Sequence, residues 1–318
     1  MNTDIMVKKN KSSFKKNNLI YAGDTPHVYK VWFVNIFLSI ITFSIYSFWA
    51  KTRIRRYVVG SFTIGGDRVV YTGTGKELFF GFIKIIPILL ILYVPLFVLG
   101  PESPVFYIIL AVLIYLFSVA IYSTRRYRFS RMLWRGIRPK LYGSAFKYGF
   151  IYIWRTFLNV ITLGVMIPFS DVKLAAYQMN NLTYGNLWFE YKPSVDGLVG
   201  VNIITLLLAL PTLFMSRIWY RAALLRNKFR SIKIQNITFK FCASGWDLYR
   251  LMAINYIIIV FTLGLGKPIV LQRNIRFVVA NLVIIGDIAA LEAYQAEKEA
   301  TTMGEGMDVI FGLEPALM

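Results

Sequence analysis

The chain has 318 residues, of which 57% are hydrophobic and only 16% are charged. This composition is too apolar for an ordinary soluble domain, and several apolar runs reach the length that crosses a bilayer, so we expect a polytopic membrane protein. The single cysteine, Cys242, excludes an internal disulfide framework and a cysteine-based metal cluster.

The net charge of +20 comes from clusters of lysine and arginine that stand between the apolar runs. Such clusters are typical of loops that stay in the cytoplasm. A nucleic-acid-binding protein would instead carry its arginines on a soluble face, with aromatic side chains for base stacking. We therefore expect no nucleic-acid partner.

The first segment, residues 1–30, is polar and rich in lysine, and it predicts a disordered basic tail. No small-residue cleavage site follows the first apolar run, 31–49, which predicts an uncleaved membrane segment rather than a signal peptide. A basic helical stretch comes next. Residues 61–71 then predict a small β-hairpin, because β-branched side chains surround Gly65-Gly66.

Two clear spans are predicted at 82–99 and 104–122, joined by the turn 100–103, which has no basic residue. The later apolar elements are residues 148–167, 198–216 and 251–266. We therefore expect an all-α polytopic membrane protein with about six transmembrane helices, and with small β-hairpins after the repeated segments. The chain ends in an acidic tail, residues 287–318, with a short helix predicted near 289–298.

The distribution of positive charge predicts on which side of the membrane each loop lies. The strongly basic loops 125–147 and 217–250 are predicted to be cytoplasmic, and the turn 100–103 is predicted to be external. Four spans satisfy this assignment, namely 82–99, 104–122, 148–167 and 198–216. The assignment places residues 168–192 outside. The elements 31–49 and 251–266 either cross the membrane or dip into it and return.

An internal repeat starts from Thr42 and recurs at Thr262. In both copies an asparagine stands seven residues before the threonine, and two arginines follow at offsets of 11 and 14. A more divergent copy around Thr162 has Ala176 in place of the second arginine, as an outward-facing copy would need. The copies predict one membrane domain, 31–286, with three repeats that start near residues 31, 148 and 251.

Three stretches carry a resemblance to a known family. They are Trp32-Phe33-Val34-Asn35, the run from Thr42-Phe43-Ser44 through Trp49-Ala50-Lys51-Thr52-Arg53, and Gly306-Met307-Asp308. The chain from Lys30 onward resembles the YjgN-like family of bacterial inner-membrane proteins, although Phe43-Ser44 replaces the Leu-Gly of the family motif. The resemblance implies an inner-membrane location. It brings no activity, cofactor or catalytic residue.

Six polar residues are candidates for a function inside the membrane: Asn35, Thr42, Arg155, Thr162, Asn255 and Thr262. They either line a polar path between repeats, as in transporters with broken helices, or hydrogen-bond to neighbouring helices. Arg155 occupies the position that the asparagines hold in the other copies. Its charge inside a span indicates a functional site, whereas a place near the inner end would let its side chain reach the headgroups.

The basic and aromatic clusters are candidates for contact with anionic lipid headgroups. The residues are Lys51, Arg53, Arg56, Arg125, Arg126, Arg128, Arg273 and Arg276. The alternative is that they serve only as signals that fix the topology.

Catalytic chemistry finds little support in the sequence. The one histidine, His27, lies in the polar tail, and no carboxylate lies within the four spans, so no cofactor, metal site or enzyme activity is expected. We expect a small-solute transporter or channel, or alternatively a structural or scaffolding membrane protein. A polar cavity that joins Asn35, Arg155 and Asn255 would favour transport, and a dry, packed centre would favour the scaffold.

Overall fold

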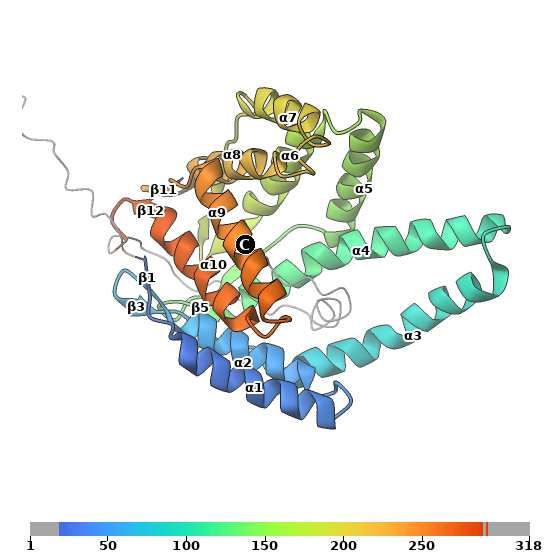
Figure 1. The fold of residues 1–318 in the computed structure, drawn as a ribbon, viewed down its shortest axis with the longest axis horizontal. Helices are drawn as coiled ribbons and strands as arrows, with labels where there is room; N and C mark the ends of the chain where they lie inside the picture. Colours follow the sequence, from blue (N-terminus) through green and yellow to red (C-terminus); the bar gives the residue numbers. More distant parts are fainter. Residues whose placement is uncertain (1–18, 289–290, 292–318) are drawn as a thin grey trace, which may run out of the picture.

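The computed structural model describes residues 19–288 and Leu291. Most of the predicted basic tail and of the predicted acidic tail, including the short helix near 289–298, lies outside the described residues. The structure is mostly helical, with short strands between pairs of helices (Figure 1).

Ten helices are present in the described part of the chain. They are α1 (Thr25–Ile41), α2 (Ser47–Gly60), α3 (Gly75–Leu99), α4 (Pro104–Ser130), α5 (Ala145–Ile161), α6 (Ile167–Met179), α7 (Leu198–Leu207), α8 (Arg217–Arg230), α9 (Gly245–Phe261) and α10 (Lys267–Asn281). The strands are β1 (Leu19–Tyr21), β2 (Phe62–Ile64), β3 (Asp67–Arg68), β4 (Val70–Tyr71), β5 (Met132–Leu133), β6 (Pro139–Leu141), β7 (Leu182–Tyr184), β8 (Leu187–Trp188), β9 (Glu190–Tyr191), β10 (Ile232–Ile234), β11 (Ile237–Phe241) and β12 (Leu282–Ile285).

The helices form five equivalent hairpins, which we number as units 1 to 5: α1–α2, α3–α4, α5–α6, α7–α8 and α9–α10. In every unit the strand before the hairpin pairs antiparallel with the strand after it. The pairs in matching register are Tyr21 with Phe62, Tyr71 with Met132, Leu141 with Leu182, Tyr191 with Ile232, and Phe241 with Leu282. The described chain is thus a fivefold repeat of one strand–hairpin–strand element.

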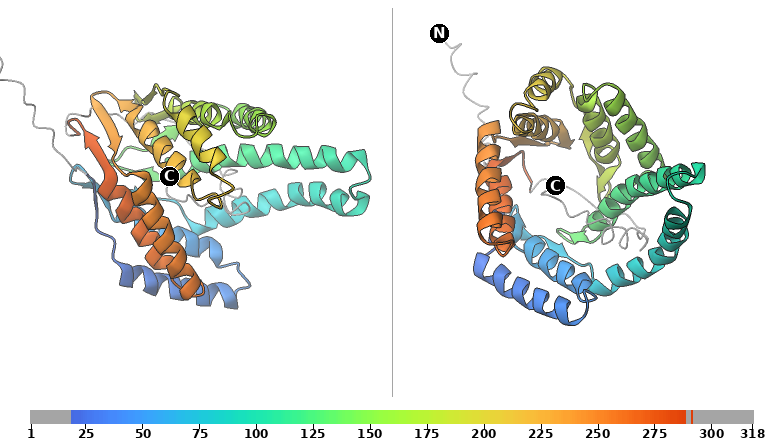
Figure 2. Two further views of the ribbon diagram at one scale, coloured as in Figure 1. Left: turned by 45° about the horizontal axis from the view of Figure 1, so that its top comes forward. Right: turned by 45° about the vertical axis from the view of Figure 1, so that its right-hand side comes forward.

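The five units close into a ring. The second helix of each unit packs on the first helix of the next, and α10 returns to pack on α1, as the right-hand view of Figure 2 shows. The helix-to-helix contacts centre on one buried apolar position in each first helix: Val28, Leu78, Tyr148, Leu198 and Leu248. Closure buries this position in all five units and leaves no open end.

The strands gather at one end of the ring, which we call the basal end, and the hairpins turn at the opposite, tip end. At the basal end one apolar cluster takes a side chain from the same position of every unit: Ile64, Trp134, Tyr184, Ile234 and Ile284. Side chains at a second equivalent position, Ile137, Leu187 and Ile237, join this axial cluster. The axis of the ring is therefore closed by apolar packing at its basal end.

The hairpins predicted after the first two repeated segments are present, whereas after the third the described residues hold only the strand β12, which pairs with β11. Strands β2 and β3 pair around Gly65-Gly66, and β7 and β8 pair around Gly185. These glycines have φ values of 60°, 93° and 61°, which L side chains rarely adopt. The turns therefore form where the sequence placed them.

The predicted membrane segments need correction. Helices α3 and α4 are long and apolar enough to cross a membrane, by length and composition alone. Four other predicted segments are not continuous helices, because each contains the turn of its hairpin: 31–49, 148–167, 198–216 and 251–266. These turns contain no charged residue and only one or two serine or threonine side chains each, so hydropathy runs through the turn without a break.

The turns also change which predicted loops lie on the same side of the molecule. The loop 125–147 lies at the basal end, and the turn 100–103 lies at the tip of the longest hairpin (Figure 1). The predicted loop 217–250 begins with helix α8, which runs from the tip of its hairpin to the basal end, and only its later part lies there. Residues 168–192 were expected on the opposite side from 125–147. The structure corrects this expectation, because α6 runs back to the basal end and β7 pairs with β6.

Candidate functional site

The predicted threonines hold the hairpin turns together. Thr42 donates a hydrogen bond from its hydroxyl to the carbonyl of Leu38 (2.7 Å) and accepts one from the amide of Tyr46 (2.9 Å). Thr162 and Thr262 make the same pair of bonds in their own turns. A fourth copy, Thr212, accepts from the amide of Ser216 at 3.1 Å. These hydroxyls are therefore engaged in the turns.

The structure does not bring Asn35, Arg155 and Asn255 together. Asn35 is buried and donates to the carbonyl of Ala50 within its own unit (3.4 Å). Asn255 is bonded within its own unit as well, to Asn274 and Arg273. Arg155 is half-buried on α5 and makes no hydrogen bond or ion pair within the described part of the chain. A polar path through these three residues is therefore not formed.

Three of the predicted headgroup-binding arginines, together with a fourth arginine that was not predicted, connect neighbouring units instead. Each donates from its guanidinium to a backbone carbonyl just before the first helix of the next unit. The bonds are Arg56 to Gly73 (3.2 Å), Arg126 to Gly143, Arg226 to Ala243 (2.8 Å), and Arg276 to Gly23 (3.1 Å), the last of which closes the ring. Arg226 belongs to this set but escaped the sequence prediction, because its copy of the repeat was not recognised.

The other predicted headgroup contacts have varied surroundings. Arg53 lies over the ring of Tyr46 at 5.9 Å, and Arg273 bonds Asn255 at 3.1 Å. Arg125 reaches across a unit boundary to Gln178. Lys51 and Arg128 are half-buried.

One unit boundary lacks the arginine contact. Between units 3 and 4, Ala176 stands where the other units have arginine, so no guanidinium reaches the backbone before α7. Helix α7 also starts late, at Leu198, whereas the first helices of the neighbouring units start three residues earlier in the repeat. Asn227 takes the place of the tyrosine that, as Tyr177 in unit 3, spans to the cap residue Ser144. Boundary 3–4 therefore lacks both the arginine contact and the first turn of the following helix that the other boundaries have.

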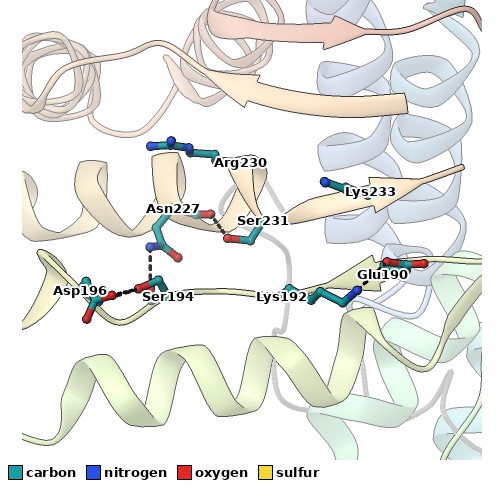
Figure 3. Close-up of a pocket in the computed structure, with 8 residues that line it drawn as sticks. All are labelled: Glu190, Lys192, Ser194, Asp196, Asn227, Arg230, Ser231 and Lys233. Carbon is teal, nitrogen blue, oxygen red and sulfur yellow. Dashed lines mark hydrogen bonds and ion pairs between the residues drawn. The ribbon is translucent and has the colours of Figure 1, made fainter. Parts of the chain in front are cut away.

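A pocket of about 510 Å³ opens within unit 4, between the segment that precedes α7 and the end of α8 (Figure 3). It is lined by Glu190, Lys192, Ser194, Asp196, Asn227, Arg230, Ser231 and Lys233. Asn227 donates to the carbonyl of Ser194 (2.7 Å), while its own side-chain oxygen is buried without a partner. Lys192 pairs with Glu190 at 3.1 Å. The pocket thus offers cationic, anionic and amide groups around one space.

A second group of polar and charged side chains lies between α6, α7 and α8. Arg217 donates to the side-chain oxygen of Asn202 (2.9 Å) and to Thr205 (3.1 Å), and Asn202 is fully buried. Tyr220 donates to Asp171 at 2.8 Å, and the guanidinium of Arg217 lies 4.6 Å from its ring centre. A carboxylate, a phenol and a guanidinium are therefore linked inside the ring.

Lys228 on α8 extends this group of charges toward the basal end. Withdrawal of its ammonium group from water lowers the pKa of Lys228 to about 8, and the positive charge of Arg125 lowers it further, while Asp171 opposes the shift. Gln178, which bonds Arg125, donates to the hydroxyl of Tyr148 at 2.7 Å. Units 2, 3 and 4 all contribute to this cluster, which we call the boundary cluster: Arg125, Tyr148, Asp171, Gln178, Asn202, Arg217, Tyr220 and Lys228.

The boundary cluster can bind and orient a charged solute or relay a proton between titratable groups. Among the described residues, no set of three or more His, Cys, Asp or Glu side chains is placed to hold a metal ion. Sequence reasoning missed the cluster because its members come from three units. One signal was available, the single Asp171 in a repeat position where the other units have lysine, arginine or an aliphatic residue.

Comparison with known proteins gives one match. The family described as "Bacterial protein of unknown function (DUF898)" matches residues 16–217 and again 196–309. Two successive matches to one family in one chain agree with its repeated architecture. No curated protein and no solved structure matches the chain.

Proposed function

The chain belongs to the DUF898 family of bacterial proteins of unknown function, and from its geometry we propose that it is an integral inner-membrane protein that moves a small charged solute. The observation that carries this proposal is the boundary cluster. Charged side chains inside a membrane domain are costly, and where they persist they usually serve a pathway, a proton relay or a ligand.

The membrane location within this proposal rests on α3 and α4, the two helices with the length and apolarity of spans. The likeness to the YjgN-like family supports the inner membrane of bacteria as the place. The basic residues near the basal end supply positive charge for the cytoplasmic side and for anionic headgroups. The proposal includes no nucleic-acid partner and no enzyme activity.

A second candidate function is a structural or scaffolding role. The observation that favours it is the axial cluster, where side chains of all five units meet in apolar packing at the basal end of the axis. The engagement of the threonines and of Asn255 in hydrogen bonds within their own units points the same way. Transport would then have to use boundary 3–4 rather than the axis.

Flux measurements separate the two candidates. Metabolite and ion profiling of a strain that lacks the protein names the solute, and purified protein in liposomes is then assayed for its uptake. We expect Asp171→Asn and Arg217→Gln to reduce uptake at least tenfold. Glu102→Gln, which alters an exposed carboxylate in the turn after α3, should leave uptake unchanged. An unchanged profile, together with liposomes that take up no solute, would favour the scaffold.

A further inference from the structure

Building on the proposed membrane location, we propose that four of the five hairpins are re-entrant. Units 1, 3, 4 and 5 enter the membrane from the basal side, turn among the acyl chains of one leaflet, and return. Unit 2 alone crosses. Both ends of the described chain, the loops of the basal end and its strands then lie on the cytoplasmic side.

Helix length distinguishes unit 2 from the others. From Val31, the first residue after Lys30, α1 rises about 16 Å to Ile41 at about 1.5 Å per residue. The apolar part of α9, from Leu251 to Phe261, gives the same rise of about 16 Å. A hydrocarbon core is about 30 Å thick, so these helices reach about half of it.

Unit 2 carries an insertion that makes its hairpin longer than the others. The paired strand residues Tyr71 and Met132 enclose a segment 20 residues longer than the one between Tyr21 and Phe62. Divided between two helices, the insertion adds about 15 Å to the hairpin. The apolar part of α4, from Pro104 to Thr124, accordingly rises about 31 Å. Helix α4 thus has the full thickness of the core, and α1 and α9 have about half.

The backbone amides of the four short turns are all hydrogen-bonded within their own hairpins. In unit 5, the amides of Thr262, Leu263, Gly264, Leu265 and Gly266 all donate within the hairpin, the last of them to the hydroxyl of Thr262. The same five bonds recur in the other three short hairpins. Non-helical backbone survives at membrane depth only when its polar groups are satisfied without water.

The side chains at the tips agree with this placement. The residue that follows the threonine is apolar and at least 80% exposed in each short turn: Phe43, Leu163, Leu213 and Leu263. The tip of unit 2 is instead Gly100-Pro101-Glu102-Ser103, with an exposed carboxylate. Burying the carboxylate of the unit 2 turn in hydrocarbon would be costly, so we place this turn in water. The four apolar turns carry no such cost, and we place them among the acyl chains.

The charged groups nearest the short turns are on the second helices. Arg217 donates to the side-chain oxygen of Asn202, and the side chain of Lys267 packs with its Cε atom against the turn at Gly264. Helix α1, the first helix of unit 1, lies on the outer side of α2 (Figures 1 and 2). Its exposed Phe37 and Ile40 then face the acyl chains.

Cysteine accessibility in the full-length protein tests the proposal. In a Cys242→Ala background, single cysteines are placed at three short tips (Leu163→Cys, Leu213→Cys, Leu263→Cys), at the tip of unit 2 (Glu102→Cys) and at the basal end (Lys240→Cys). We expect a membrane-impermeant maleimide to label position 102 only from outside and position 240 only in inverted vesicles. The three short tips should remain below a tenth of the labelling reached after denaturation in SDS.

A bimane fluorophore on each short tip provides the second readout. Lipids with a nitroxide in the acyl chain should quench it several-fold more than lipids with a nitroxide on the headgroup. Labelling of a short tip from outside would show that its hairpin crosses, and labelling in inverted vesicles would show that the tip lies in water. Oxidative crosslinking between tips without acyl-chain quenching would identify a second copy as the occupant. Each of these three results overturns the re-entrant arrangement while the membrane location stands. Release of the protein by carbonate would overturn the location itself.

Discussion

Arg276 donates a hydrogen bond of 3.1 Å to the carbonyl of Gly23, which lies 253 residues earlier in the chain. This bond repeats, between the last unit and the first, the contact that Arg56 makes with Gly73 between neighbouring units. A chain of repeats normally ends in two exposed faces that need capping. Here the contact between α10 and α1 removes both faces, so every hairpin has two neighbours.

Removal of this guanidinium should loosen the closed ring. We expect Arg276→Ala to lower the free energy of unfolding by about 1–3 kcal/mol, the usual contribution of a hydrogen bond to a charged donor. Thermal unfolding in detergent measures the loss, and Arg56→Ala should show a similar one. Arg68→Ala, at an exposed position of β3, is the matched control and should have little effect. Equal stability of all three variants would show that the arginine contacts do not hold the units together.

The threonine of each short turn should be replaceable by serine but not by valine. Thr262→Val keeps the shape but removes the acceptor for the amide of Gly266 and the donor to Ile258. An unsatisfied amide costs about 1–3 kcal/mol. We expect a lower melting temperature for Thr262→Val than for Thr262→Ser, measured by differential scanning fluorimetry in detergent. If Thr162→Val also melts at a lower temperature than Thr162→Ser, the result extends to unit 3. Equal melting temperatures for the two substitutions would show that backbone hydrogen bonds alone stabilise the turn.

Part of this fold was accessible from sequence because some repeat positions keep their residue type. The threonine, the arginine and the glycine turn survive in units 1 and 5, and their spacing predicted equivalent hairpins. Unit 4 escaped recognition because Thr205 and Ala223 stand where units 1 and 5 have the asparagine and the first arginine. Its turn residue Phe214, like Ser44 of unit 1, has a positive φ (64°) where units 3 and 5 have glycine. Unit 2 escaped because its 20-residue insertion shifts Arg126 out of register with the other arginines.

The predicted number of transmembrane helices differs from the structure for a different physical reason. Hydropathy measures how apolar a segment is, and the turn residues Leu163 and Leu263 are as apolar as the helices that they join. Their φ values of 48° and 50° reverse the chain, and a single threonine in each turn is too little polarity to interrupt the hydropathy. The boundary cluster was missed for a third reason, since its members Arg125, Asp171 and Lys228 meet only when the ring forms, and the isolated Asp171 was the one signal for it in the sequence.

The two predicted asparagines should differ in their contribution to stability. Asn255 makes two side-chain hydrogen bonds, to Asn274 at 2.6 Å and from Arg273 at 3.1 Å. Asn35 makes one long bond of 3.4 Å to Ala50, and its oxygen is buried without a partner. We expect Asn255→Leu to cost about 1–3 kcal/mol, because Arg273 loses its acceptor, and Asn35→Leu to cost clearly less. Chemical unfolding in mixed detergent measures both. A larger loss for Asn35→Leu would contradict the hydrogen bonding described.

Stability should depend on pH through Lys228. Its pKa in the folded state is about 8, below the ordinary value of 10.5, because its ammonium group is withdrawn from water. Below pH 8 both states hold the proton, and the folded state bears the whole cost of the enclosed charge. Between pH 8 and 10.5 the unfolded state binds more protons than the folded state, so stability rises with pH, by up to about 3 kcal/mol. Above pH 10.5 the gain is complete.

Lys228→Met isolates this effect from other titrating groups. The variant should be more stable than the wild type at pH 7, and the difference between them should shrink as the pH rises from 8 to 10. Lys240→Met, at an exposed position of β11, is the matched control, and its difference from the wild type should stay constant. Melting temperatures measured across this range in one detergent provide the comparison. A constant difference for Lys228→Met would mean that the ammonium group of Lys228 keeps its ordinary pKa in the folded protein.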